Sequence, residues 1–222
     1  MKALVIGASG AVGTHIVKEL LDHPSYDEVH IFVRKPTGIV APKLTEHIVD
    51  FDVMYDWAKE LTGDVLFSSM GTSKRAAGSK DAQWRVDYDY QYNVARMAAH
   101  QGVNTYALVS SAGASADSSF FYLSMKGFLE EAVEKMEFKH IVIARPASLI
   151  RPKPKLAEVI SCRAFGLINR VGLAKDWEPI DAAVVAHALV EETTGRALKG
   201  KQEGFSRTCI LSNRHMLDRY TG

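Results

Sequence analysis

A tyrosine and a lysine four residues apart could carry acid–base chemistry in this chain of 222 residues. Tyr122 and Lys126 lie in Ser119–Met136, whose apolar pattern predicts a helix, so the two side chains share one helix face. A phenol has an ordinary pKa of about 10 and exchanges protons poorly at neutral pH, and a nearby ammonium lowers that pKa. The pair therefore predicts a proton-transfer site of the kind that carbonyl reduction requires, and Lys126 could also bind a nicotinamide ribose.

Two serines stand where they could hold a substrate oxygen beside this pair. The segment Tyr106–Ser110 predicts a buried strand, and Ser110 and Ser111 come at its carboxyl end. A hydroxyl at that end of a parallel strand points into the cleft where ligands bind. Either serine could fill the position.

A glycine-rich loop near the N-terminus predicts a dinucleotide phosphate site. Three glycines at spacings of three lie between a predicted strand, Ala3–Ile6, and a predicted helix, Ala11–Leu21. Glycine allows a tight turn and a close backbone approach, and the helix N-terminus offers free N–H groups to phosphate. The alternative is a strand–helix turn that is glycine-rich without a ligand. The residues predicted to bind the phosphates are Gly7, Ser9, Gly10, Ala11, Val12 and Gly13.

The residues after the second strand bear on the choice of dinucleotide. Enzymes that use NAD(H) place an acid there to bind the ribose 2′-hydroxyl. Here Val33 is followed by Arg34 and Lys35, and a cation can pair with a 2′-phosphate. The sequence therefore favours NADP(H), with NAD(H) possible, and the alternative is a pair of solvated basic residues.

Two further candidate cofactor-binding residues follow the third predicted strand, Glu46–Val49. Asp50 is placed to meet the adenine amino group, and Phe51 follows it. An aspartate at a strand end can equally cap the next turn. Both readings stay open for Asp50.

Short apolar runs alternate with helical patterns along the chain. Continuous apolar strands separated by helices predict an α/β fold of Rossmann type: a doubly wound parallel sheet with helices on both faces and a small C-terminal extension on the substrate side. The chain is expected to be one domain, 1–222, in which 147–222 forms the substrate side of the cleft. Further strands are predicted at Asp64–Ser69, Ile141–Ala144 and Thr208–Leu211, and further helices at Lys80–His100, Leu156–Asn169 and Ile180–Thr194.

Composition excludes several classes of function. The formal net charge of +1 gives no electrostatic case for nucleic acid or membrane binding. No apolar segment is long enough to span a bilayer, and the apolar start Ala3–Ile6 is too short for a signal peptide. Cys162 and Cys209 form no motif, which is typical of a reducing compartment. These features predict a cytoplasmic protein, and the scattered histidines predict no metal site.

Four motifs together resemble those of the short-chain dehydrogenase/reductase superfamily. They are GASGAVGTHIV at Gly7–Val17, VSSAGAS at Val109–Ser115, YLSMK at Tyr122–Lys126, and Arg145-Pro146. The chain is most similar to the atypical branch that includes the Tat-interacting oxidoreductase-like proteins. Val86–Tyr90 and Ser118–Phe120 share in this resemblance, which covers the first 150 residues well and the remainder loosely.

The resemblance implies a Rossmann fold with a Ser-Tyr-Lys active site. It places the serine on Ser111, with Ser110 as its neighbour, and assigns the acid–base pair to Tyr122 and Lys126. One position departs from the pattern: many relatives carry an asparagine that holds a proton-relay water, where this chain has Asp87. An acid there could bind the same water, or form a cap or salt bridge within its helix. The resemblance also implies ribose contacts at Ser69, Met70 and Gly71 and a nicotinamide contact at Pro146.

The first hypothesis is an NADP(H)-dependent oxidoreductase that moves a hydride between nicotinamide and a small carbonyl or alcohol substrate. One alternative is an NADP(H)-binding regulatory or redox-sensing scaffold without turnover. Another is an epimerase or dehydratase that keeps NAD⁺ bound, since such enzymes use the same residues. The expected partner is a small-molecule substrate, and the chain is compatible with a monomer or a homodimer.

Overall fold

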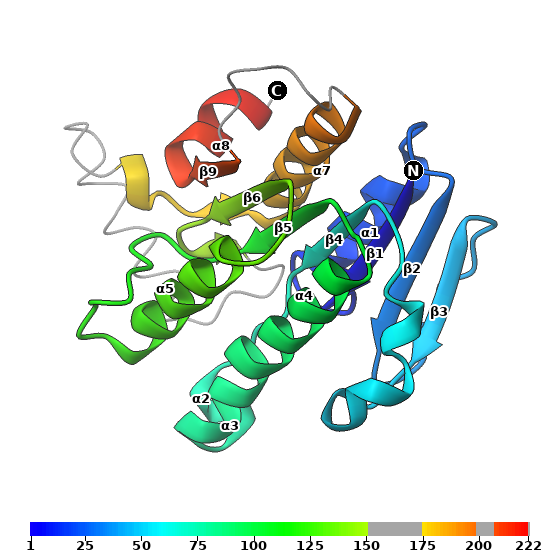
Figure 1. The fold of residues 1–222 in the computed structure, drawn as a ribbon. Coiled ribbons are helices and arrows are strands. Elements are labelled where there is room, and N and C mark those ends of the chain that lie inside the picture. The colour runs from blue at the N-terminus through cyan, green and yellow to red at the C-terminus, as the bar shows by residue number, and fades with distance from the viewer. Residues whose placement is uncertain (151–174, 199–206, 222) are drawn as a thin grey trace.

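A parallel sheet forms the centre of the molecule. The computed structural model describes residues 1–150, 175–198 and 207–221, and within them the strands of the main sheet run in the order β3-β2-β1-β4-β5-β6-β9 (Figure 1). The Rossmann-type α/β prediction is confirmed. The strands are β1 (Lys2–Ile6), β2 (Glu28–Val33), β3 (Leu44–Ile48), β4 (Val65–Ser68), β5 (Thr105–Val109), β6 (His140–Arg145) and β9 (Thr208–Ser212); β7 (Leu149–Ile150) and β8 (Ile180–Asp181) pair separately.

Helices cover both faces of the sheet because the strand side chains alternate between two apolar layers. Ala3 and Val5 of β1 belong to the layer that α1 and α7 cover, whereas Leu4 and Ile6 belong to the layer beneath α4 and α5. The α-helices are α1 (Gly13–Asp22), α2 (Lys74–Ala77), α3 (Lys80–Trp84), α4 (Tyr90–His100), α5 (Phe121–Glu134), α7 (Ala182–Leu198) and α8 (Asn213–Tyr220). Short 3₁₀ helices are η1 (Phe51–Asp56), η2 (Ala58–Glu60) and η4 (Lys175–Trp177).

The strand order places a switch point between β1 and β4. The chain runs outward from β1 through β2 to β3, and then returns to β4 on the other side of β1. Ile6 pairs in register with Ser68, so the two carboxyl ends lie side by side. Ligands of open α/β sheets bind in the crevice at such a point.

One long helix of the sequence prediction is interrupted in the structure. Lys80–His100 divides into α3, a π-helical turn η3 (Arg85–Asp89), and α4. A π turn adds one residue to a helical turn and often occurs at functional sites. Periodicity does not reveal it, because the apolar pattern of the residues on either side still fits a helix. The predicted helix Leu156–Asn169 lies outside the described residues.

Part of the segment 147–222 completes the main sheet and its cover. β9 pairs in parallel with β6, and α7 packs against α1 on the same face. That residues 147–222 also form the substrate side of the cleft stays a prediction. Within the described residues no helix is long and apolar enough to cross a membrane.

Candidate active site

The glycine loop joins β1 to α1 at the switch point. Gly7 has a φ of +80°, and a Cβ there would lie 2.5 Å from the Ser69 carbonyl carbon. A Cβ on Gly13 would lie 2.0 Å from the Gly7 oxygen. These two glycines are therefore required by packing itself. Gly10 meets a milder contact, 3.1 Å from the Gly7 oxygen, so tight packing explains its identity less well than an open approach to a ligand does.

The N-terminus of α1 fits a phosphate group. Its N-cap is Val12, which supplies no side-chain cap, and the backbone bonds of the loop run from Gly10 N–H to Gly7 O (2.8 Å) and from Thr14 N–H to Gly10 O (3.1 Å). Within the described part of the chain, the N–H groups of Ala11, Val12 and Gly13 have no hydrogen-bond acceptor. Free N–H groups at the positive end of a helix bind anions. Ser9 and Ala11 are exposed at the rim of the loop.

The loop after β4 runs beside the glycine loop, and its predicted ribose contacts stay a prediction. The Ser69 hydroxyl donates to the Ile6 carbonyl at 3.1 Å, which ties the ends of β4 and β1 together. Met70 packs on the core, and Gly71 lies where an added Cβ would be 3.5 Å from Asp87 Oδ1. The predicted Ser69–Gly71 segment thus lies between the phosphate loop and the π turn.

The two serines after β5 have different surroundings. Ser110 is buried, and its hydroxyl donates to the Glu130 carboxylate, which also accepts from Arg145 Nε at 3.1 Å. Ser111 is half-buried; its hydroxyl donates to the Ala112 carbonyl oxygen at 3.3 Å and lies near enough to the Tyr122 phenol to act on its pKa. The structure therefore gives Ser110 a structural partner and leaves Ser111 facing the tyrosine.

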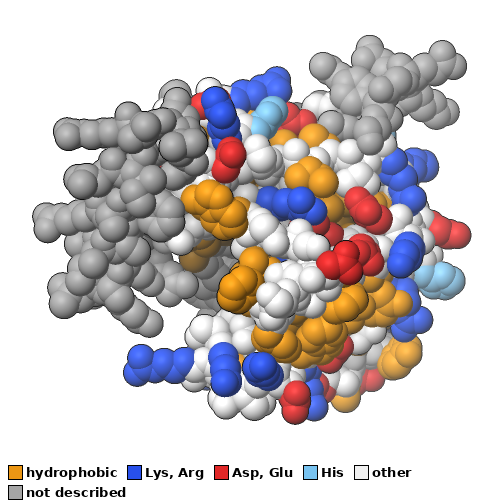
Figure 2. All heavy atoms as spheres, turned by 90° about the vertical axis from the view of Figure 1, so that its left-hand side faces the viewer, with side chains coloured by type: hydrophobic (Ala, Val, Ile, Leu, Met, Phe, Trp, Pro, Cys, Tyr) orange, Lys and Arg blue, Asp and Glu red, His pale blue; other side chains and the backbone are white. Residues whose placement is uncertain are grey.

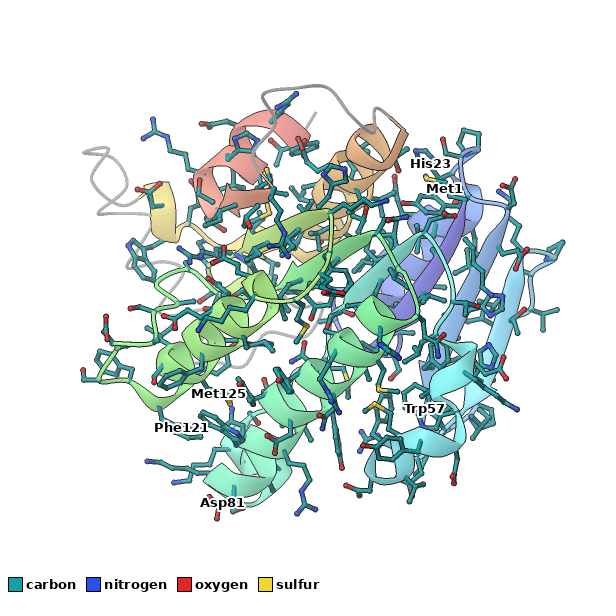
Figure 3. The ribbon with its side chains drawn as sticks, viewed as in Figure 1. Met1, His23, Trp57, Asp81, Phe121 and Met125 are labelled. Atoms are coloured by element: carbon teal, nitrogen blue, oxygen red, sulfur yellow. The ribbon has the colours of Figure 1, made fainter. Side chains whose placement is uncertain are left out.

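Close packing of α5 on the loop after β5 brings Tyr122 and Lys126 to the carboxyl end of β5. A Cβ on Gly127 would lie 2.1 Å from the Ser115 carbonyl carbon, so only glycine lets the loop after β5 approach the helix. On another face of α5, Phe121 and Met125 extend toward α3 (Figure 3), and the Phe121 ring lies 6.1 Å from that of Trp84. Sequence reasoning missed Gly127, although a glycine inside a predicted helix is a signal of close packing.

The Lys126 ammonium is held by the π turn. Its side chain is 2% exposed, and Nζ lies 3.8 Å from Oδ1 of Asp87, which is fully buried. Nζ also lies 3.5 Å from the Val109 carbonyl oxygen. Asp87 therefore forms an ion pair between helices, rather than a cap or salt bridge within its own helix.

The pKa of Tyr122 shifts opposite to the direction expected from the sequence. Burial of the phenol group and, second, the negative charge of Asp87 together raise the pKa to about 12, and the Ser111 hydroxyl acts against them. The side chain is still 40% exposed. Burial also lowers the pKa of Lys126, while the carboxylates of Asp87 and Glu130 act to raise it. The expectation of a lowered pKa is wrong because burial disfavours the charged phenolate, and the Asp87 carboxylate adds to this effect.

The predicted adenosine contacts lie at the ends of β2 and β3. Arg34 and Lys35 are exposed, and neither forms an ion pair with another described residue. The Asp50 carboxylate accepts the Asp52 N–H at 2.9 Å and caps η1, so the capping reading of Asp50 is observed. Phe51 is 5% exposed and packs in the core, which leaves little of its ring for a ligand.

The other wall of the site involves β6 and η4. Buried Pro146 accepts the Ala112 N–H at 2.8 Å, which joins the ends of β5 and β6. Trp177 was not predicted: its ring lies 3.1 Å from the place a Cβ on Gly113 would occupy, and Gly113 has a φ of +77°. Phe120, Tyr122 and Trp177 are all exposed, and on the side that carries α5 Figure 2 shows hydrophobic side chains among charged ones.

One polar cluster lies between α1 and α7. His187 Nδ1 is 2.8 Å from Glu19, and the ligand atoms of Glu19, His187 and Glu191 lie within 4.8 Å of one another. Sequence reasoning missed this group because α1 and α7 are far apart in the chain. The three side chains are half-buried or exposed. Glu19 pairs with His187, and Glu191 pairs with His23, so these contacts are those of an ordinary helix–helix surface.

Curated relatives correct one expectation. The chain is 36% identical over 208 residues to "Protein fmp52-1, mitochondrial" of Aspergillus terreus, covering 88% of each chain. It is also 36% identical over 154 residues to "Protein FMP52, mitochondrial" of Saccharomyces cerevisiae, covering 68% of this chain and 66% of that protein. By this comparison the expectation of a cytoplasmic protein is wrong, because the names of both relatives designate them as mitochondrial. Apolar segment lengths and cysteine usage, on which the expectation rested, do not reveal this location.

Solved structures support the fold. The chain is similar to a Thermus thermophilus UDP-glucose 4-epimerase in complex with NAD, with a TM-score of 0.66 at 17% identity, covering 98% of this chain and 81% of that one. It is also similar to MoeE5 in complex with UDP-glucuronic acid and NAD, with a TM-score of 0.65 at 18% identity, covering 95% of this chain and 75% of that one.

A family model agrees with the geometry of the phosphate loop. The model described as NAD(P)H-binding matches residues 7–161, which begin at the glycine loop and include the π turn, the Ser111 loop and α5. The matched part holds the uncapped helix N-terminus and the whole Tyr122–Lys126 constellation. The chain therefore belongs to the NAD(P)H-binding family, and the matched residues form most of its Rossmann-type sheet.

Proposed function

We propose that the chain is a nicotinamide-dependent oxidoreductase of the short-chain dehydrogenase/reductase type, within its atypical branch, that acts on a small carbonyl or alcohol. The observation that carries this proposal is the convergence of Ser111, Tyr122 and Lys126 at the carboxyl end of β5, on the same edge of the sheet as the glycine loop after β1. Ser111 reaches the Tyr122 phenol, and Lys126 lies one turn along the same helix, buried at the carboxyl ends of the strands. A surface coincidence of these residue types would not bury the lysine.

The chain's own residues would divide the work as follows. The bound dinucleotide supplies or accepts the hydride. The α1 N-terminus and Gly10 hold its phosphates, and Lys126 holds its ribose. Ser111 positions the substrate oxygen by a hydrogen bond, and Tyr122 exchanges a proton with that oxygen at its phenol Oη.

The direct test combines nucleotide titration with a substrate panel. NADPH bound to the chain should show altered nicotinamide fluorescence, and a set of aldehydes and ketones should include compounds that cause NADPH oxidation. Nucleotide binding with no oxidation across the panel would favour a regulatory or redox-sensing scaffold instead. Absence of nucleotide binding would contradict the whole proposal.

We further propose that NADP(H) is the preferred dinucleotide. Arg34 is exposed at the end of β2 without an ion-pair partner among the described residues, and so is free to meet a 2′-phosphate. Replacing Arg34 with alanine should weaken NADPH binding by about 10- to 100-fold, the scale of one hydrogen bond to a charged group. NADH binding should change little. The matched control is Arg96→Ala, at an exposed position on α4, and equal losses for both nucleotides would contradict the assignment.

The proposed substrate side of the cleft includes Trp177 and other parts of 147–222. Trp177 covers the loop after β5 and remains 49% exposed, so it offers an apolar surface next to Ser111 and Tyr122. This surface suits a small substrate with an apolar portion beside its carbonyl group.

A further inference from the structure

The Asp87 carboxylate touches two segments that are both predicted to contact ribose. Its Oδ2 accepts the Thr72 N–H at 2.8 Å, in the loop after β4, and its Oδ1 lies 3.8 Å from Lys126 Nζ on α5. An added Cβ on Gly71 would lie 3.5 Å from the same Oδ1. The loop and the ammonium therefore meet at one carboxylate. Asp87 and Lys126 are both buried, so little water screens their attraction.

Buried hydrogen bonds hold the π turn η3 in this place. The Gln91 amide nitrogen donates to the Asp87 carbonyl oxygen at 2.6 Å, and Gln91 Oε1 accepts the Ser68 hydroxyl at 2.8 Å. The Gln83 amide donates to the Thr72 carbonyl oxygen at 3.1 Å. Ser68, Gln83 and Gln91 are all buried. Asp87 is thus fixed through its main chain and its side chain to the end of β4 and to the loop that follows it.

The Lys126 ammonium keeps hydrogen-bond donors for a ligand. An ammonium has three N–H donors. One donates to the Val109 carbonyl oxygen at 3.5 Å, and the 3.8 Å from Nζ to Asp87 Oδ1 is too long for a direct hydrogen bond. In the part of the chain that the structure describes, Nζ has no further acceptor. Asp87 therefore attracts the ammonium without occupying the donors that a ribose hydroxyl needs.

A second carboxylate near the lysine is already occupied. Glu130, one turn along α5, also acts on Lys126, but it accepts the Ser110 hydroxyl and binds Arg145 Nε at 3.1 Å. Among the described residues, Asp87 forms an ion pair with Lys126 alone. Asp87 is therefore the counter-ion that decides where the ammonium lies.

We propose that Asp87 is a positioning residue for nucleotide binding: its carboxylate holds the loop after β4 through Oδ2 and the Lys126 ammonium through Oδ1, so that both ribose contacts are in place before the nucleotide arrives. This inference rests on the proposed oxidoreductase function and deepens it. A lysine side chain that is already ordered loses less entropy when it binds a ligand. Asp87 should consequently affect the half of the dinucleotide that carries the nicotinamide ribose, and not the adenosine half.

The binding test replaces Asp87 with asparagine, which keeps an acceptor for the Thr72 N–H but removes the charge that holds Lys126. NADPH binding, followed by nicotinamide fluorescence, should weaken about tenfold, as for the loss of one hydrogen bond to a charged group. The fragments 2′,5′-ADP and ADP lack the nicotinamide ribose, and calorimetric titration should show their affinities unchanged. Asp89→Asn makes the same chemical change in the same π turn and should leave the binding of NADPH and of both fragments unaltered.

Two results of the binding test would overturn the inference. One is an equal loss of affinity for NADPH and for the fragments, because a purely structural role of Asp87 would disturb the whole nucleotide site. The other is unaltered NADPH affinity in folded Asp87→Asn.

Thermal unfolding without nucleotide tests the ion pair itself. Asp87→Asn should lower the melting temperature of the otherwise unmodified chain, because Lys126 then keeps a buried charge without its counter-ion. In a Lys126→Met background the same change should raise the melting temperature, because it removes a buried carboxylate that has lost its cation. A similar lowering in both backgrounds would mean that Asp87 does not act through Lys126, and would overturn the inference. Failure of the unmodified chain to bind NADPH would instead contradict the proposed function, whereas the sign of this change decides the Asp87–Lys126 pairing without any nucleotide.

Discussion

Replacing Tyr122 with phenylalanine is expected to lower kcat for carbonyl reduction by about 10²- to 10⁴-fold, the usual contribution of a positioned acid. The phenol is the proton donor nearest to the place that Ser111 defines for the substrate oxygen, and phenylalanine keeps the ring while removing the proton. The fold should persist, because the Tyr122 side chain is 40% exposed and Phe121 and Met125 carry the packing of α5 on α3.

Two measurements check this expectation. Stopped-flow or steady-state NADPH oxidation gives the loss of turnover, and nicotinamide fluorescence should show nucleotide affinity unchanged. Tyr55→Phe is the matched control, since Tyr55 is 82% exposed on η1 and far from α5 in the sequence. Full turnover in the Tyr122 variant would contradict its role, and so would an equal loss in the control.

Replacing Gly10 with alanine is expected to weaken nucleotide binding by about 100-fold while the chain stays folded. The new methyl group would lie 3.1 Å from the Gly7 oxygen, a contact that a small shift relieves. In the proposed complex that shift and the methyl group would keep the pyrophosphate from the free N–H groups at the start of α1. Two lost charge-assisted hydrogen bonds account for a change of this size.

Two other glycine variants show whether the effect belongs to the ligand. Gly195→Ala lies on α7, where an added Cβ meets nothing within 4 Å, and should leave affinity unchanged and stability equal or higher. Gly13→Ala would place its Cβ 2.0 Å from the Gly7 oxygen and should lower the melting temperature sharply. Nucleotide titration and thermal unfolding distinguish the three, and unaltered affinity in Gly10→Ala would contradict the proposed phosphate site.

The sequence by itself determined the elements whose signals are local. Strand β1, the glycine loop and helix α1 follow from the order of apolar residues and glycines within Ala3–Leu21, and the observed bounds differ by one or two residues. The Tyr122–Lys126 spacing likewise fixes one helix face wherever the helix lies. Local patterns of this kind need no knowledge of what packs against them.

Other features of the candidate site depend on contacts between distant parts of the chain. Ser110 is distinguished from Ser111 by Glu130 of α5, which accepts the Ser110 hydroxyl and is itself held by Arg145 of β6. Asp50 caps η1, an element too short for any periodicity to reveal. Trp177 comes to the site by covering Gly113, and Trp177 itself belongs to no motif.

The electrostatics of Tyr122 show most clearly what only the tertiary structure decided. From the sequence, the nearest charge is Lys126, which predicts a lowered pKa. In the structure the phenol is buried, and the π turn brings the Asp87 carboxylate to 3.8 Å from that lysine; burial first and this charge second raise the pKa of Tyr122. The physical reason is that a pKa depends on every charge and every loss of solvent within a few ångströms, whereas a motif records only the neighbours along the chain.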